Sequence, residues 1–313
     1  QVSELSPRSA GLYSLPHISR TISAVATTIA YTNTRPALGE PRTALNSDYQ
    51  IDQPAGPIGA NISGIDLNNI NSTAVDFIRK ALSEHVVLFF RDQALDAASL
   101  LELASKFGSP VPYPFVKGLS GFPEVVEVIK RPGDTLNFGG VWHSDTAYLE
   151  TPAMGALLYG VDIPKRGGDT LFTNMYNVFD SLSTGMQSFL GSQMAINDAD
   201  NEAIRATRPG STKKGLLATH PVVRTHPVTK RPLLYINKAH TTRFAGMSES
   251  ESAPILNFLF ERIMQPEFSC RFQWQRGSLA FWDNRACQHY PLNDYQGELR
   301  KMLRVSLAGD KPR

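Results

Sequence analysis

The region from Val125 to the C-terminus consists of short β-forming runs that are separated by glycine, proline and polar residues. Runs of this length and composition predict strands, and their uneven spacing does not fit an alternating βα fold. The sequence therefore predicts a mostly β fold with flanking helices, either a β-sandwich or an open barrel of jelly-roll type. The predicted strands cover residues 86–90, 156–160, 170–172, 222–225, 233–236, 278–282 and 302–307.

Three segments predict helices outside these strands. Residues 73–82 carry an apolar stripe at helical spacing, and Ser72 or Thr73 can cap the first turn. Residues 96–107 begin with an aspartate, which is a good N-cap, and stop before a glycine. Residues 255–264 predict a third helix.

The chain of 313 residues is long enough for one large domain or two modest ones. Residues 1–46 differ from the rest, because they contain two acidic residues against four arginines and are rich in Ser, Thr, Ala and Pro. Such a segment is either a mobile or loosely packed extension or an organellar targeting segment. We therefore predict an N-terminal extension, residues 1–46, and a main domain, residues 47–313.

Charge and apolar content limit the kinds of partner. The net charge is +2 and no block of like charges occurs, so we expect no nucleic-acid partner. No apolar run approaches the roughly 20 residues that span a bilayer, so we expect no membrane partner. Cys270 and Cys287 are too few for a disulfide framework and suit a reducing compartment, with one bridge or two buried thiols as alternatives. We expect a cytoplasmic protein unless residues 1–46 target it to an organelle.

A candidate metal site is formed by His143 and Asp145, which are two residues apart, and by the distant His289. Residues i and i+2 of an extended segment point to the same side, so one strand end can present the first two to one ion. Two imidazoles and one carboxylate leave one face of an octahedral ion open, as in non-haem Fe(II) oxygenases. Because Asp145 leaves no space for a halide on iron, hydroxylation is favoured over halogenation. The other histidines lack a partner at ligand spacing and are interpreted as structural or exposed: His17, His85, His220, His226 and His240.

Arg300 and Arg304 lie four residues apart in the last predicted strand. On an extended strand they share one face, about 13 Å apart, while the opposite face is apolar. A guanidinium is a preferred partner of carboxylates and other oxyanions. The pair could therefore bind a cosubstrate and a substrate on one wall, and two solvated surface arginines are the alternative.

Over roughly residues 49–311 these motifs resemble the taurine/2-oxoglutarate dioxygenase family (TauD/TfdA) of Fe(II)-dependent oxygenases. The most specific segments are residues 142–145, 167–170, 220–227 and the stretch from residue 281 to 304. The resemblance implies a double-stranded β-helix (jelly roll) and an oxidoreductase that uses dioxygen and decarboxylates 2-oxoglutarate. It implies Fe(II) ligation by His143, Asp145 and His289, binding of the distal 2-oxoglutarate carboxylate by Thr170 and Arg300, and binding of the substrate's anionic group by Arg304.

The chain departs from the taurine-specific pattern of that family. Where taurine enzymes have His, Tyr and Asn, an ungapped comparison places Tyr113, Val116 and Gly139. Tyr113, Val116 and Tyr148, with Phe115, would line a larger and more apolar pocket. We therefore expect hydroxylation, with cleavage where the attacked carbon carries the anionic group, of an alkyl sulfate, sulfonate or aryloxyalkanoate. Taurine itself and biosynthetic hydroxylation of a carboxylate-bearing metabolite are the alternatives.

Two other classes of protein remain open. A Zn(II) hydrolase could use the same triad, although it would need no dicarboxylate clamp such as Arg300 and Thr170. A non-catalytic jelly-roll binding protein with a degenerate site is the third possibility. The polar stretch of residues 197–219 is either a lid or a plain surface loop. We expect a homo-oligomer, a dimer or a tetramer.

Overall fold

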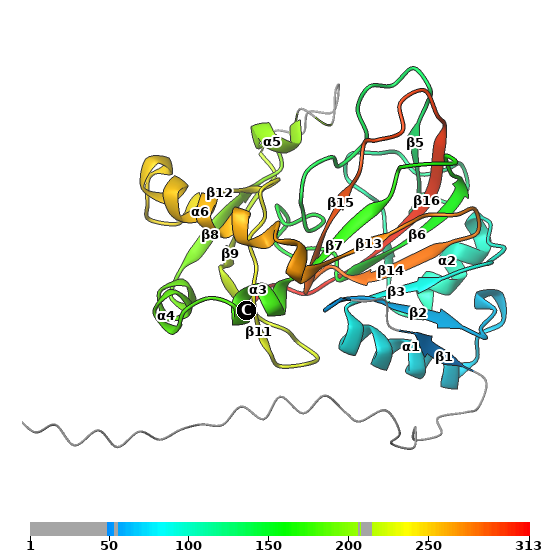
Figure 1. Cartoon of the computed structure of the whole chain (residues 1–313), viewed down its shortest axis with the longest axis horizontal. Coiled ribbons are helices and arrows are strands. Elements are labelled where there is room, and N and C mark those ends of the chain that lie inside the picture. Colours follow the sequence, from blue (N-terminus) through cyan, green and yellow to red (C-terminus); the bar gives the residue numbers. More distant parts are fainter. Residues whose placement is uncertain (1–48, 53–55, 206, 208–214) are drawn as a thin grey trace, which may run out of the picture. The chain divides into compact units, whose positions relative to one another are not determined.

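The computed structural model describes residues 49–52, 56–205, 207 and 215–313 (Figure 1). The predicted N-terminal extension, residues 1–46, lies outside the described residues, and the domain division remains a prediction. The central part of the polar stretch 197–219 also lies outside them, so its interpretation as a lid or a surface loop stays open. Its described ends belong to two strands, β8 (Met194–Asp198) and β9 (Leu217–Pro221), and to the short helix α5 (Glu202–Arg205).

The main sheet has eight strands among the described residues. Neighbouring strands are antiparallel except for the parallel pair β2–β3. β16 pairs with β6 along one edge and with both β4 and β5 along the other, so it is an interior strand. The order is β1 (Gln50–Asp52), β2 (Ala60–Ser63), β3 (Val87–Phe90), β14 (Leu279–Asp283), β6 (Gly155–Asp162), β16 (Arg300–Leu307) and β4 (Pro110–Val111), with β5 (Val125–Lys130) also on β16.

A smaller sheet of β13 (Ser269–Phe272), β7 (Thr170–Asn174) and β15 (Cys287–Pro291) packs against the main sheet. Phe172 of β7 contacts Phe89 of β3 and Trp282 of β14, with ring centroids 5.7 and 5.9 Å apart. The two facing sheets form the double-stranded β-helix, so the jelly-roll prediction is confirmed. One core cluster fills the space between the sheets, and it includes the inward side chains of β3, β14 and β7.

Two helices cover the other face of the main sheet, α1 (Ser72–His85) and α2 (Ala97–Ser105). Alternate residues of β3, Leu88 and Phe90, belong to this second core cluster. The N-cap of α1 is Asn71, so the expected capping residues were wrong by one or two positions. Asp96 caps α2 as expected, and its side chain accepts a hydrogen bond from the Ser99 backbone.

A third group of elements comprises the sheet β12–β8–β9, the hairpin β10–β11 and the helices α3, α4 and α6 (Figure 1). Helix α6 begins six residues earlier than expected, because Pro254 lies inside it and the capping box of Ser248 and Glu251 starts the helix ahead of that proline. The predicted strands all occur, with bounds within two residues of those expected. The remaining bounds are α3 (Met175–Asp180), α4 (Thr184–Gly191), β10 (Val223–Thr225), β11 (Pro232–Leu234), β12 (Thr241–Phe244) and α6 (Glu249–Ile263).

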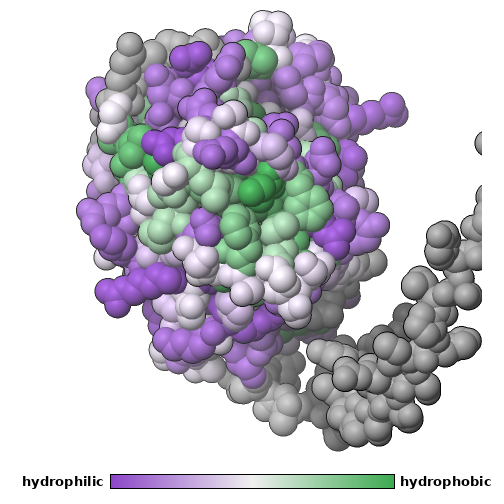
Figure 2. All heavy atoms as spheres, turned by 90° about the vertical axis from the view of Figure 1, so that its left-hand side faces the viewer, coloured by the Kyte–Doolittle hydropathy of each residue, from purple (hydrophilic) through white to green (hydrophobic). Residues whose placement is uncertain are grey.

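The face of the molecule that carries β8, β9, β12, α4 and α6 has a central apolar area within a polar rim (Figure 2). Met194 on β8 and Leu217 on β9 are 41% and 55% exposed. Both cysteines are buried and free, so the alternative of a Cys270–Cys287 bridge was wrong. No described helix combines the length and the apolar character needed to cross a membrane.

Candidate active site

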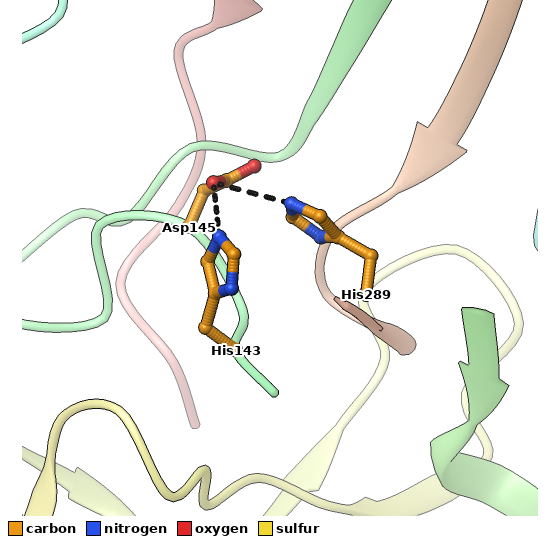
Figure 3. Close-up of side chains that lie close together, drawn as sticks. All are labelled: His143, Asp145 and His289. Atoms are coloured by element: carbon orange, nitrogen blue, oxygen red, sulfur yellow. Dashed lines mark ion pairs between the residues drawn. The ribbon is translucent and has the colours of Figure 1, made fainter. Parts of the chain in front are cut away.

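The structure brings together the three predicted metal ligands, His143, Asp145 and His289 (Figure 3). Oδ1 of Asp145 lies 3.6 Å from Nε2 of His143 and 3.9 Å from Nε2 of His289. The three ligand atoms are all within 4.8 Å of one another. Metal bonds of about 2.0–2.2 Å place neighbouring ligands of an octahedral ion about 3 Å apart, so the side chains need to move by only about an ångström to share a cation.

The two histidines are held together by the backbone. The His143 N–H donates to the His289 carbonyl at 3.1 Å, and the His289 N–H donates to the His143 carbonyl at 2.9 Å. This contact is an isolated bridge, and Thr146 has a φ of 54°, so the expected regular strand end carrying His143 and Asp145 is not present. Nδ1 of His143 lies 2.6 Å from the Val141 carbonyl oxygen, which can only accept. Nδ1 therefore carries the proton and the Nε2 lone pair faces the site.

Asn284 fixes the backbone around Asp145, and the sequence did not single it out. Its Oδ1 accepts a hydrogen bond from the Asp145 N–H at 2.7 Å. Its Nδ2 donates to the carbonyls of Asp145 at 3.0 Å and Ala153 at 2.9 Å. Because Asn284 is fully buried, these three bonds tie the segment that carries the carboxylate to the end of β14.

Replacing Asn284 with alanine is expected to lower the free energy of unfolding by about 2–3 kcal/mol, since buried polar groups would lose their partners. Metal affinity should fall about tenfold, because the carboxylate loses its backbone support. Denaturant unfolding and metal titration measure the two effects. Asn293→Ala is the matched control, since Asn293 is only partly buried and its amide bonds the Thr135 carbonyl and the Gln296 side chain rather than the segment of Asp145. Equal stability and affinity in the two variants would exclude this role for Asn284.

The electrostatic setting suits metal ligands. Asp145 is 1% exposed, and its Oδ2 lies 2.6 Å from Nη2 of Arg304. Burial opposes ionisation, but the adjacent Arg304 charge outweighs it and holds the pKa of Asp145 well below its ordinary value. Burial lowers the pKa of His289 well below its ordinary value, so its imidazole is neutral at pH 7. The site therefore presents one carboxylate and neutral imidazole nitrogen, the forms that bind metals.

A cavity beside the triad is lined by both histidines and by Thr170, Arg300 and Arg304. Arg300 is 6% exposed, and its Nε and Nη2 have no hydrogen-bond partner among the described residues. The nearby acid Asp169 pairs instead with Arg271, at 2.6 Å. A buried guanidinium without a carboxylate partner is costly unless a ligand supplies the anion.

A second cavity, of about 210 Å³, adjoins the first, because Arg304 and Phe138 line both. Tyr113 and Val116 line this second cavity, as the sequence predicted. Tyr148 lines neither cavity. It is buried and packs edge-on against Phe115, with ring centroids 5.5 Å apart.

A buried charged cluster lies at the end of β14. Asp283 accepts two hydrogen bonds from the Arg285 side chain, at 2.8 and 2.6 Å, and lies 3.0 Å from Nε2 of His226. Burial opposes ionisation of Asp283, but these partners hold its pKa well below the ordinary value. His226 is thus structural, and His220 and His240 are also buried rather than exposed. In the sequence, Asp283 and Arg285 stand two residues apart directly after the predicted strand 278–282. This pair was the sequence signal from which the cluster could have been predicted.

Residues 50–306 match the family model described as "Taurine catabolism dioxygenase TauD, TfdA family". The chain belongs to this family. The match covers the triad, both arginines and Thr170, and it confirms the resemblance that the motifs suggested.

Relatives within the TauD/TfdA family resemble most of the chain. It is 35% identical over 274 residues to an alkylsulfatase of Acinetobacter baylyi, covering 83% of this chain and 85% of the relative. It is 31% identical to an alpha-ketoglutarate-dependent sulfate ester dioxygenase of Pseudomonas putida, covering 85% and 91%. A crystal structure of a taurine dioxygenase from Burkholderia xenovorans superposes with a TM-score of 0.74 at 32% identity, covering 85% and 91%.

Proposed function

We propose that this protein is an Fe(II)- and 2-oxoglutarate-dependent dioxygenase that hydroxylates an anionic organic substrate, with a sulfate ester as the favoured class. The observation that carries the proposal is the histidine–carboxylate triad beside a buried arginine, Arg300, for which residues 49–52, 56–205, 207 and 215–313 supply no anionic partner. The similarity to an alkylsulfatase and a sulfate ester dioxygenase supports the substrate class. Hydroxylation of the carbon that bears the sulfate would release it and leave a carbonyl product.

The triad fits Fe(II). His143, Asp145 and His289 would supply two nitrogen ligands and one oxygen ligand on one face and leave the opposite face open. Bound Fe(II) with 2-oxoglutarate supplies dioxygen activation that is coupled to oxidative decarboxylation of 2-oxoglutarate to succinate and carbon dioxide. The protein's own contribution is to hold the ligands in their metal-binding protonation states and to shield the site from water.

Arg300 and Thr170 fit the distal carboxylate of 2-oxoglutarate. Both side chains are buried, and both line the cavity that contains His143 and His289. The cosubstrate would thus bridge from the metal to the start of β16. A hydrolase using the same triad would leave the Arg300 charge unneutralised, which argues against the Zn(II) alternative.

Arg304 and the second cavity fit a substrate with one anionic group and an apolar body. Arg304 is the sole cation among the residues that line this cavity, and the remaining lining is mainly Val, Ile, Phe and Tyr. The acid of the lining, Glu127, is already paired with Lys301 at 2.7 Å. The cavity therefore offers the ammonium group of taurine no unpaired carboxylate, and taurine is the less favoured alternative.

The proposal is tested by measuring succinate, sulfate and oxygen consumption with Fe(II), 2-oxoglutarate and a panel of alkyl sulfates, alkyl sulfonates, aryloxyacetates and taurine. We expect succinate formation to be stimulated most by an alkyl sulfate, with one sulfate released per succinate. Sulfate release under anaerobic conditions without 2-oxoglutarate would show a hydrolase instead.

Arg304→Ala is expected to raise the KM for the anionic substrate about 10-fold to 100-fold, because a charge-assisted hydrogen bond is lost. Substrate-independent decarboxylation of 2-oxoglutarate should fall much less, because bound Fe(II) can neutralise Asp145 when the paired Arg304 is absent. Steady-state kinetics at varied substrate and at varied 2-oxoglutarate separate the two effects. Loss of 2-oxoglutarate binding with unchanged substrate KM would mean that Arg300 and Arg304 have the opposite roles.

We also propose that the protein forms a homo-oligomer, a dimer or a tetramer. The apolar area on the face of β8 and β9 supports this, since extended apolar patches often mark protein interfaces (Figure 2). Sedimentation of the wild type and of a Met194→Lys, Leu217→Lys double variant tests it. A monomeric wild type would contradict the proposal.

A further inference from the structure

Trp274 makes a buried contact with one of the two candidate cosubstrate residues. Its indole Nε1–H donates a hydrogen bond of 2.9 Å to Oγ1 of Thr170. The two side chains are 3% and 2% exposed, so water does not compete for this bond. Thr170 is the first residue of β7, and its side chain lines the cavity that also contains Arg300.

The chemistry of the two groups determines which one donates the hydrogen bond and which one accepts it. An indole N–H can only donate, whereas a hydroxyl can both donate and accept. Because Trp274 occupies Oγ1 as an acceptor, the Thr170 O–H remains available as a donor. The described residues provide no other hydrogen bond for this hydroxyl, so its proton is free to be donated to a ligand oxygen in the cavity.

The same indole also packs beside the arginine. Cζ of Arg300 lies 5.8 Å from the Trp274 ring and 6.0 Å from the Tyr295 ring, within the range of cation–π contacts. The Trp274 ring is itself packed edge-on against Phe272, with centroids 4.8 Å apart. One rigid side chain therefore contacts both groups that face the cavity.

We propose that Trp274 is a positioning residue for the cosubstrate: its N–H orients the Thr170 hydroxyl so that the O–H donates to the distal carboxylate of 2-oxoglutarate. This inference rests on the proposed function. It assigns the ligand chemistry to the distal end of the cosubstrate, since the second carboxylate of 2-oxoglutarate can accept that proton beside Arg300. A 2-oxo acid of equal length that ends in a methyl group does not use the Trp274–Thr170 pair.

The test compares 2-oxoglutarate with 2-oxopentanoate, which carries a methyl group in place of the distal carboxylate. Binding of each to the Fe(II)-loaded protein is measured by anaerobic calorimetry. Trp274→Phe keeps an aromatic ring and removes the N–H. We expect its Kd for 2-oxoglutarate to rise about 5-fold to 20-fold, as for loss of one oriented hydrogen bond to a charged group, and its Kd for 2-oxopentanoate to change less than about twofold.

Two threonine variants show whether Trp274 acts through Thr170. In a Thr170→Val background, Trp274→Phe should cause no further loss of 2-oxoglutarate affinity, because the hydroxyl is already absent. Thr170→Ser keeps the hydroxyl, and should keep both near-normal affinity and sensitivity to Trp274→Phe. Unfolding midpoints of all variants identify any that are misfolded.

Each unfavourable result has a distinct meaning. Equal weakening of both ligands by Trp274→Phe, or additive losses in the double variant, would show a purely structural tryptophan and overturn the inference. Unchanged 2-oxoglutarate affinity in Trp274→Phe would overturn it as well. A wild-type protein that binds the two 2-oxo acids equally, or neither, would instead overturn the proposed function.

Discussion

Replacing His289 with alanine is expected to remove metal binding and to reduce 2-oxoglutarate-dependent turnover by about a thousandfold or more, beyond the 10–100-fold typical of residues that only support a ligand. The reason is geometric, since three ligands meet at this site within the described part of the chain and Nε2 of His289 is one of them. His143→Ala should have the same effect. Metal analysis of the purified variants and succinate formation are the measurements.

The fold should survive these substitutions. The paired backbone hydrogen bonds between residues 143 and 289 do not involve the imidazoles, and Asp145 keeps Arg304 as a counter-charge. His85→Ala is the matched control, because His85 is a half-buried histidine at the end of α1. Added imidazole should restore part of the turnover of His289→Ala, since it can enter the vacated space. Full coupled turnover in both ligand variants would refute the metal assignment.

The sequence could predict the triad because its signal is local and chemical. A histidine and an aspartate two residues apart, with a distant histidine in a second motif, are the residue types that one cation needs, and the arginines share a strand face. Arg300 and Arg304 are the first and fifth residues of β16 and both are buried, so the alternative of two solvated arginines was wrong.

The contacts that support the triad could not be predicted, because they join segments that are distant in the sequence. Asn284 is 139 residues from Asp145, and His226 is 57 residues from Asp283. Nothing in the local pattern near either residue indicates its partner. Such pairs are determined by how the sheets pack rather than by periodicity.

Local geometry explains the smaller differences. Thr146 has a positive φ, which redirects the backbone directly after Asp145, so strand alternation no longer predicts where Tyr148 lies. Three successive residues, Asn71, Ser72 and Thr73, can all cap a helix, and sequence preference alone does not choose among them. Proline is common at the first position of a helix, so Pro254 suggested that the helix begins after it. In the structure Pro254 lies inside α6 instead.

Replacing Arg300 with methionine is expected to weaken 2-oxoglutarate binding by about a hundredfold or more, because removing one partner of a buried charge pair costs roughly 2–5 kcal/mol. The guanidinium is closely confined. A Cβ on Gly168 would lie 3.2 Å from Cδ of Arg300, and the Trp274 and Tyr295 rings lie near Cζ. Arg300→Lys should recover only part of the affinity, since an ammonium cannot form the two-pronged contact.

Arg300→Met should weaken cosubstrate binding but should leave the free energy of unfolding equal or raise it. Arg300 is buried without an ion-pair partner in the described part of the chain, and burial lowers its pKa. Without cosubstrate, this charge opposes folding, so Arg300→Met should unfold at the same or a higher denaturant concentration than the wild type. Lys301→Met is the control, because the neighbouring Lys301 pairs with Glu127 and should leave 2-oxoglutarate affinity unchanged. Arg300→Met should also bind 2-oxoglutarate and 2-oxopentanoate almost equally. Retained preference for 2-oxoglutarate would mean that another cation holds its distal carboxylate.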